Sequence, residues 1–384
     1  MTAATILPPA RLGIVGGGQL ARYFVAKARA MGYHTAVLDP DPGCPAMQLA
    51  EARIVAAFDD AAALDQFATL CDAVTVEYES VPAGSIRRVA RHCRVAPSAE
   101  AFAVLEDRIR EKRFLRAIGL PATPYIPVIV PEDLERAGCY PGVLKLARQS
   151  YDGKGQARVD DPRQALAAWR DLGHRPALLE RRVAIDAEIA VVLARTADGR
   201  IASYPAALNR IRDGVPVLSV APAPVPAGAA TDADLGARRI AQCLDYVGVL
   251  SVEFFLCAGR LLVNEVSPRT HACGFLSLEA CGTSQFEQQV RALCGLPLGG
   301  TALRSPAAIA HLDGSLLRRE PDWSAALGDS GGVLHLYGKA QPRPRRRMGH
   351  VTVLAPSADE AAARAAAVLA RLNDSGAASG RRAA

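Results

Sequence analysis

The sequence predicts an α/β and α+β protein in which a doubly wound parallel sheet precedes an α+β region and a small β-rich C-terminal region. Two observations lead to this fold class. Up to about residue 98, short apolar runs alternate with amphipathic helical stretches, which is typical of parallel strands covered by helices on both faces. Beyond residue 120, strand-like runs follow one another closely. The 384 residues suffice for two or three packed domains.

The N-terminal elements alternate between strand and helix. We expect strands at LGIVG, HTAVLD, ARIVAA, DAVTVEYE and CRVAPS, with helices over residues 19–31, 61–70 and 85–92. A charged amphipathic helix over residues 101–119 is ended by Gly119 and Pro121.

The later elements are mostly strands. They are expected at YIPVIV, GVLKLA, ALLERRV, EIAVVLA and RIASYPAAL, before a helix over residues 232–244. A hairpin VGVLSVEFFLCAGRLLVNEVSP, a helix over residues 284–293 and three strands at AAIAHL, VLHLYGKA and GHVTVLA follow. The predicted domains are residues 1–100, 101–297 and 298–360, with a final helix and tail over residues 361–384.

Composition and charge restrict the class of protein. The net charge is +6, and the arginine run at residues 343–347 is more typical of a solvated face or a small-anion site than of a nucleic-acid groove. The nine cysteines have neither zinc-site nor disulfide spacing. There is no signal-peptide pattern and no apolar run of membrane length. We therefore expect a cytoplasmic protein that acts on neither membranes nor nucleic acid.

The first strand leads into a glycine-rich turn. Gly16, Gly18 and Ala21 match the spacing of a dinucleotide-binding fingerprint, with Asp39 as the possible ribose anchor. In LDPDP, however, two prolines indicate a rigid turn, so we interpret Asp39 as structural.

Carboxylates on the predicted hairpin form a candidate metal site. Glu253 lies on one strand, and Asn264 and Glu265 end the next, so an antiparallel pairing brings them side by side. Oxygen ligands of this kind suit Mg²⁺, which bridges nucleotide phosphates. A surface hairpin with scattered acids is the alternative, but Glu253 has apolar neighbours on both sides.

A second candidate site is GVLKLARQSYDGKGQ. Lys145 lies within an apolar strand and needs a partner, for which a phosphate would serve. Gly153 and Gly155 flank Lys154 in a loop that can close over phosphates, although the P-loop pattern is absent. Taken by itself, this segment is better explained as a glycine-rich hairpin turn.

Taken in order, the motifs resemble those of the ATP-grasp superfamily. LDPDPGCPAMQLAE, YDGKGQ, LDYVGVLSVEFF, TSQFEQ and LYGK…MGHVTVL are similar to motifs of the 5-(carboxyamino)imidazole ribonucleotide synthase family, from about residue 12 to residue 354. This resemblance implies an ATP-grasp fold with a Rossmann-like pre-ATP-grasp domain, a homodimer, and the use of ATP and Mg²⁺. It implies that bicarbonate attacks ATP to give carboxyphosphate, which carboxylates the amine of aminoimidazole ribonucleotide.

The resemblance also implies roles for individual residues. Glu253 and Glu265 would bind Mg²⁺. The ATP site would comprise Arg108, Lys145, Ser150, Tyr151, Asp152, Gly153, Lys154, Gly155, Gln156, Glu180, Arg181, Arg182, Val183, Glu188, Asn264 and Glu265. The phosphorylated acceptor would contact Gln19, Leu20, Glu77, Lys339, Arg346 and Arg347, and the catalytic residues would be Arg269, His271, Asp152 and Lys339.

The sequence departs from the family pattern around the expected acceptor. Leu208, Ile211, Ala272, Cys273, Phe275 and Leu276 replace polar or aromatic family residues, and Gln149 and Ser150 replace two glycines. We place the purine reaction first, and a paralogue that acts on another amine is therefore the alternative. An NAD-dependent oxidoreductase and a catalytically silent nucleotide-binding protein are further alternatives. We interpret Cys273 as filling an apolar gap, and His335 and His350 as satisfied structural imidazoles.

Overall fold

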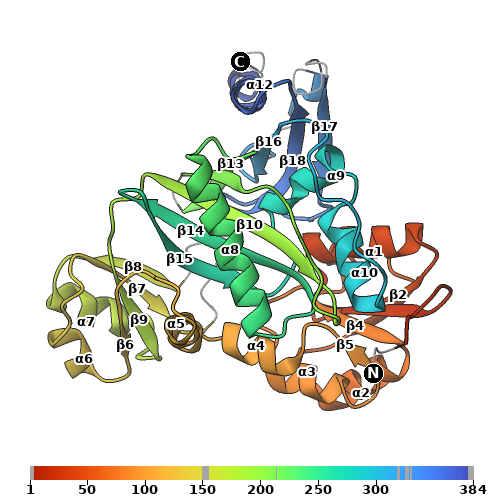
Figure 1. Cartoon of the computed structure of the whole chain (residues 1–384), viewed down its shortest axis with the longest axis horizontal. Helices are drawn as coiled ribbons and strands as arrows, with labels where there is room; N and C mark the ends of the chain where they lie inside the picture. Colours follow the sequence, from red (N-terminus) through yellow and green to blue (C-terminus); the bar gives the residue numbers. More distant parts are fainter. Residues whose placement is uncertain are drawn as a thin grey trace.

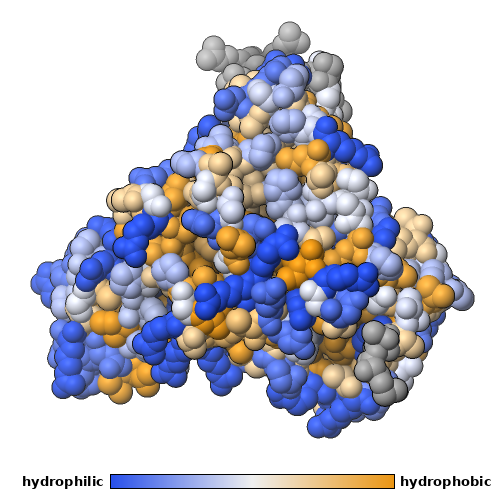
Figure 2. All heavy atoms as spheres, viewed as in Figure 1, coloured by the Kyte–Doolittle hydropathy of each residue, from blue (hydrophilic) through white to orange (hydrophobic). Residues whose placement is uncertain are grey.

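The structure is a computed structural model that describes residues 4–148, 155–212, 214–317, 321–324, 328 and 331–378. Three β-sheets form its frame (Figure 1). A parallel sheet contains the N-terminal strands, a large antiparallel sheet continues into the C-terminal strands, and a small antiparallel sheet lies to one side. Figure 2 shows hydrophilic and hydrophobic residues interspersed over the viewed face. No helix in the described part of the chain is long and apolar enough to cross a membrane.

The N-terminal sheet has the strand order β3-β2-β1-β4-β5, and all its strands are parallel. Phe24 and Val37 belong to a core on one face, whereas Phe67 and Val74 belong to a core on the other. The predicted doubly wound sheet is therefore confirmed. Its elements are β1 (Arg11–Val15), α1 (Gln19–Ala30), β2 (His34–Asp39), β3 (Ala52–Val55), α2 (Ala61–Thr69), β4 (Ala73–Val76), α3 (Ala83–Val89) and β5 (Arg94–Val95).

One predicted helix is wrong in its extent. Residues 101–119 do not form a continuous helix, because α4 (Ala99–Leu105) ends before α5 (Arg108–Ala117) begins. The Asp107 carboxylate accepts hydrogen bonds from the backbone N–H groups of Ile109 and Arg110, at 3.0 and 3.2 Å, and so caps a new helix. The new helix start turns the side chain of Arg108 toward the large antiparallel sheet.

The small sheet has the order β6-β9-β7-β8 and is covered by two helices. Its core includes Leu144, Trp169 and Leu179, which are all buried. Its elements are β6 (Tyr125–Val128), α6 (Pro131–Glu135), β7 (Gly142–Leu146), β8 (Gln156–Val159), α7 (Pro162–Asp171) and β9 (Ala177–Arg181).

The large sheet runs β15-β14-β10-β12-β13-β16-β18-β17, and β11 pairs with β10. Helix α8 packs on one face through Ile240, while Phe275 and Phe286 pack on the other. Its elements are β10 (Ala187–Arg195), β11 (Ile201–Ser203), β12 (Ala207–Arg212), β13 (Val215–Ala221), α8 (Ala227–Cys243), β14 (Gly248–Cys257), β15 (Arg260–Ser267), η1 (Cys273–Leu276), α9 (Ser277–Ala280) and α10 (Gln285–Cys294).

The C-terminal strands extend this same sheet, because β16 pairs with β13. Helix α12 covers them through buried alanine and valine side chains such as Ala365 and Val368. The elements are β16 (Ala307–Asp313), β17 (Gly332–Leu336), β18 (Arg347–Leu354) and α12 (Ala358–Ala378).

Candidate active site

The acidic hairpin of β14 and β15 has the predicted arrangement. Glu253 and Glu265 are directly opposite each other, and the Asn264 side-chain nitrogen lies 3.5 Å from the Glu253 carboxylate. The Asn264 Oδ1 atom is buried and has no hydrogen-bond partner among the described residues. Burial, together with the charges of Glu265 and Glu188, raises the pKa of Glu253 to about 8. A divalent cation would relieve this accumulation of negative charge, so the donor set fits Mg²⁺.

Two lysines lie on either side of a buried carboxylate. The Glu180 carboxylate at the end of β9 is 2.5 Å from Lys145 Nζ on β7 and 3.1 Å from Lys112 Nζ on α5. Burial alone would raise the pKa of Glu180, but Lys145 and Lys112 outweigh it and lower the pKa to about 2. Lys112 also donates hydrogen bonds to the backbone carbonyls of Val263 and Asn264, at 3.2 and 2.8 Å. It therefore ties α5 and β9 to the acidic hairpin.

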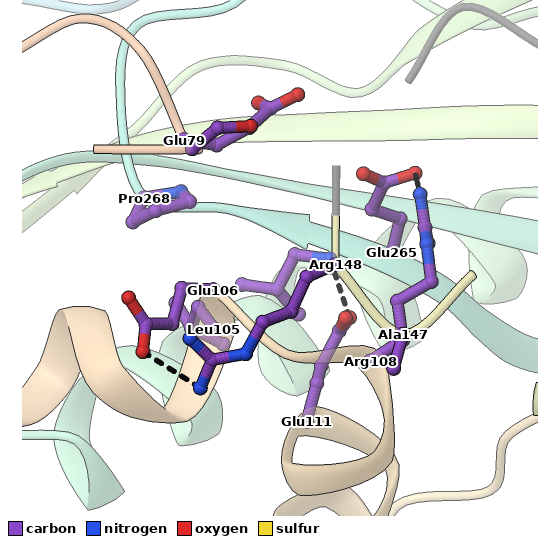
Figure 3. Close-up of a pocket in the computed structure, with 11 residues that line it drawn as sticks. Glu79, Leu105, Glu106, Arg108, Glu111, Ala147, Arg148, Glu265 and Pro268 are labelled. Carbon is purple, nitrogen blue, oxygen red and sulfur yellow. Dashed lines mark hydrogen bonds and ion pairs between the residues drawn. The ribbon is translucent and has the colours of Figure 1, made fainter. Parts of the chain in front are cut away.

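A polar pocket opens beside this cluster, with about 380 Å³ of empty space (Figure 3). Arg108 on α5 points toward Glu265, and its guanidinium donates to the carboxylate at 3.0 Å. Burial raises the pKa of Glu111 to about 7, although its carboxylate accepts a 2.8 Å hydrogen bond from the N–H of Val266. The pocket is lined by Glu79, Ser80, Leu105, Glu106, Arg108, Glu111, Ala147, Arg148, Glu265, Val266 and Pro268.

The segment after Glu180 has individual side-chain partners. The Arg181 guanidinium donates to the carbonyl of Gly138 at 2.6 Å, and that of Arg182 lies 3.2 Å from Asp160. Val183 follows β9, and Glu188 lies on β10, where burial raises its pKa.

Only the end of the predicted phosphate loop is described. Gly155 has a φ of +65°, and its carbonyl accepts a hydrogen bond from the N–H of Leu146 at 2.9 Å. Gln156 begins β8 and pairs with Lys145. The loop residues named in the predicted site that lie outside the described residues are Ser150, Tyr151, Asp152, Gly153 and Lys154.

The glycine-rich turn before α1 is closed by acidic side chains. Asp39 accepts hydrogen bonds from the N–H groups of Gly17 and Asp41, at 2.7 and 2.8 Å, which confirms its structural interpretation. The Glu77 carboxylate accepts a hydrogen bond from the N–H of Leu20 at 3.3 Å. A Cβ atom on Gly18 would approach the Glu77 carboxylate to 2.4 Å, so any larger residue here would displace the Glu77 side chain. Gln19, Leu20 and Glu77 are thus brought together at the N-terminus of α1.

Arg269 and His271 both have acidic partners. The Arg269 guanidinium forms an ion pair with Glu79, with Nε 2.8 Å from the carboxylate. His271 lies between Glu253, 3.3 Å from Nε2, and Cys273, 3.1 Å from Nδ1. Burial lowers the pKa of His271 well below its usual value and raises that of the Cys273 thiol to about 12. The imidazole is therefore neutral and the thiol protonated near neutral pH.

The C-terminal basic residues are only partly brought together. Lys339 donates a 2.8 Å hydrogen bond to the carbonyl of Arg347, whereas the Arg346 guanidinium donates to the carbonyl of Gln341 at 2.9 Å. The charge of Arg347 contributes to the lowered pKa of His271, which places its guanidinium on the side of the acidic hairpin.

Among the family departures, Ala272, Cys273, Phe275 and Leu276 are buried, and Ile211 is partly exposed. Phe275 stacks on Tyr337, with ring centroids 5.3 Å apart.

Sequence reasoning missed several charged residues of this region. Lys112 and Glu111 follow Arg108 at spacings of four and three residues, so all three share one helix face. This spacing could have indicated that the three side chains face one site. The prediction of a single long charged helix hid it. Glu79 stands two residues after Glu77 on the same segment, but no local pattern pairs it with Arg269, which lies 190 residues away.

Comparisons with known proteins agree with this arrangement. Three family profiles match: a ribonucleotide synthetase preATP-grasp domain over residues 10–106, an ATP-grasp domain over residues 113–286, and a phosphoribosylaminoimidazole carboxylase C-terminal domain over residues 311–364. The N5-carboxyaminoimidazole ribonucleotide synthase of Brucella melitensis is 40% identical over 93% of this chain and 99% of its own length.

Solved structures are similar throughout. The N5-carboxyaminoimidazole ribonucleotide synthetase of Thermus thermophilus aligns with a TM-score of 0.86 and 40% identity, covering 94% of this chain and 98% of the other. The Aspergillus clavatus synthase in complex with ADP and 5-aminoimidazole ribonucleotide aligns with a TM-score of 0.86 and 29% identity, covering 95% and 99%. The chain therefore belongs to the N5-carboxyaminoimidazole ribonucleotide synthase family of the ATP-grasp superfamily.

Proposed function

We propose that this chain carboxylates 5-aminoimidazole ribonucleotide with bicarbonate at the expense of ATP. The products are 5-(carboxyamino)imidazole ribonucleotide, ADP and phosphate, and the reaction is a step of purine synthesis. The observation that carries the proposal is the concentration of opposite charges at one place. Glu253 and Glu265 stand opposite each other, and Arg108 and Lys145 reach the same region from α5 and β7.

The cationic side chains bind and orient the triphosphate. Lys145 is held by Glu180 but has two further N–H donors, and Arg108 is held by Glu265. Magnesium bound at Glu253 and Glu265 would neutralise charge on the phosphates during transfer. Bicarbonate attacks the γ-phosphorus, which gives carboxyphosphate and ADP.

The second step needs an anion site and an acceptor site on one side of the phosphates. Arg269 pairs with Glu79 and lies within reach of the charges of Glu77 and Glu265, and its planar guanidinium can bind a carboxylate or phosphate in exchange for these partners. The amine nitrogen of the acceptor attacks the carboxyl carbon, and phosphate leaves. Gln19, Leu20 and Glu77 hold the nucleotide at the glycine-rich turn, and Lys339, Arg346 and Arg347 bind its 5′-phosphate. Neutral His271 is held beside Glu253, with Nε2 3.3 Å from its carboxylate, and would help Arg269 to stabilise the anionic intermediate.

Phosphate release from ATP tests the proposal. With Mg²⁺ and bicarbonate present, release should rise when 5-aminoimidazole ribonucleotide is added. Stimulation by other amines alone would support the paralogue reading, and no ATP use would contradict the proposal.

We also propose that the chain works as a homodimer in the cytoplasm, as the family resemblance implies. Light scattering of the purified chain measures the oligomeric state directly.

A further inference from the structure

Three side chains from separate elements meet beside the C-terminal strands. Glu279 comes from α9, and His335 and His350 are opposite each other on β17 and β18. One ligand atom from each residue can be chosen so that all three lie within 4.8 Å of one another. Figure 1 shows α9 next to the end of this sheet. Neither the proposed reaction nor the ATP site uses these side chains.

The two ring nitrogens of His350 differ in their partners, as those of a metal-binding histidine do. Its Nδ1 atom lies 2.9 Å from the hydroxyl of Tyr337, and its Nε2 atom is buried without a hydrogen-bond partner among the described residues. If Nδ1–H donates to the Tyr337 oxygen, Nε2 keeps a free lone pair. Metal-binding histidines commonly have their second nitrogen held by such a partner, which fixes the tautomer. The structure therefore contradicts the expectation that both ring nitrogens of His350 are satisfied.

Glu279 supplies the second unsatisfied atom. One carboxylate oxygen lies 2.8 Å from His335 Nε2, and the other is buried with no hydrogen-bond partner in the described chain. A lone histidine–glutamate hydrogen bond would leave both this oxygen and His350 Nε2 without partners. Each such buried group costs about 1–3 kcal/mol, and a cation between them would satisfy both.

The surroundings favour coordination. His350 is fully buried, so a cation bound there would lie in an environment of low polarity. The rings of Tyr23 and Phe275 pack against the histidines, with centroids 5.7 Å from His335 and 4.5 Å from His350 respectively. This apolar shell limits water and strengthens the attraction between a cation and the carboxylate.

We propose that Glu279, His335 and His350 bind a first-row transition metal ion, of which Zn²⁺ matches best. Two imidazoles and one carboxylate form a known zinc donor set, with water as the fourth ligand. The mixed nitrogen and oxygen donors argue against Mg²⁺, which prefers oxygen.

Coordination requires a modest rearrangement of these side chains. Tetrahedral bonds of about 2.0–2.1 Å place ligand atoms about 3.4 Å apart, so the largest separation of 4.8 Å must shorten. Rotation of the Glu279 side chain and tilting of the stacked imidazoles can supply this movement. Ligation through His335 Nε2 requires the neutral tautomer with its proton on Nδ1, so the proton that Nε2 shares with Glu279 moves through solvent to Nδ1. The ion then joins α9 to β17 and β18.

Cobalt titration tests this site without any measurement of activity. The full chain is stripped with a chelator and kept in excess Mg²⁺, which competes for the carboxylates of Glu253 and Glu265. Co²⁺ is then added, and Zn²⁺ is used to displace it. One Co²⁺ per chain should bind with the visible absorption of a tetrahedral site, and Zn²⁺ should raise the melting temperature.

Variants locate the ion. Glu279→Gln should weaken Co²⁺ binding at least about 100-fold, and Tyr337→Phe should weaken it about 10- to 100-fold. The control is His34→Gln, which removes a histidine that pairs with Glu51 at 2.6 Å on the surface; it should leave affinity unchanged. Unchanged affinity in Glu279→Gln, the absence of stoichiometric binding, or a thiolate charge-transfer band from a cysteine ligand would each overturn the proposal. Circular dichroism checks that each variant is folded.

Discussion

The buried carboxylate between two lysines gives the most quantitative prediction. Lys145 and Lys112 lower the pKa of Glu180 from 4.5 to about 2, against the effect of burial. A tenfold change in proton affinity corresponds to about 1.4 kcal/mol, so the charged form is favoured in the fold by about 3 kcal/mol. This stabilisation is complete above pH 4.5 and is lost as the pH falls through 2. Glu180→Gln should therefore lower the free energy of unfolding by about 3–5 kcal/mol at pH 7, since it leaves two buried cations without a counterion.

Trp169 offers a local probe for this experiment. It is buried in the core of the same small sheet, and Trp323→Phe removes the second tryptophan. Urea unfolding followed by its fluorescence gives the stability of this part of the chain. Asp160→Asn is the matched control, because its pair with Arg182 is exposed and should contribute less than about 1 kcal/mol. A loss in Glu180→Gln no larger than that of the control would refute the reasoning.

Three further predictions concern the pocket and the acceptor. Burial raises the pKa of Glu111 to about 7, so the free energy of unfolding of the wild type should fall by up to about 3 kcal/mol as the pH rises from 4.5 through 7. This fall should be absent in Glu111→Gln. Urea unfolding at a series of pH values measures it. Gly18→Ala would place a methyl group 2.4 Å from Glu77, so the KM for 5-aminoimidazole ribonucleotide should rise at least about tenfold, whereas the KM for ATP should stay unchanged. The control in these steady-state assays is Gly84→Ala, where the added methyl group would have no atom within 4 Å. Arg269→Lys loses the forked donor, so acceptor-dependent phosphate release should fall about 100-fold while ATP binding by calorimetry persists.

Local patterns were sufficient to predict the N-terminal sheet and the acidic hairpin. Alternating apolar runs and helices indicate parallel strands, and the short connection between β14 and β15 requires antiparallel pairing. Glu253 and Glu265 are consequently partners in the register of this hairpin. The structural role of Asp39 followed from its neighbouring prolines.

Local sequence patterns could not predict the contacts between segments that are far apart in the chain. Lys145 was expected to need an anion, yet its partner Glu180 was named only as one of the ATP-site residues, since nothing local pairs β7 with β9. Lys112 was missed because a buried lysine on a charged helix has the same local sequence as an exposed one. The break before α5 depends on the capping by Asp107, which competes with a continuous amphipathic pattern.

Transfer of labelled carbon from bicarbonate to the acceptor tests the central claim most directly. The chain is incubated with ¹³C-bicarbonate, ATP, Mg²⁺ and 5-aminoimidazole ribonucleotide, and the product is observed by ¹³C NMR. The account predicts a new carbamate resonance that grows with ADP in equal amounts, and its loss in Glu265→Gln. ATP consumption without labelled product, or an undiminished rate in Glu265→Gln, would contradict it.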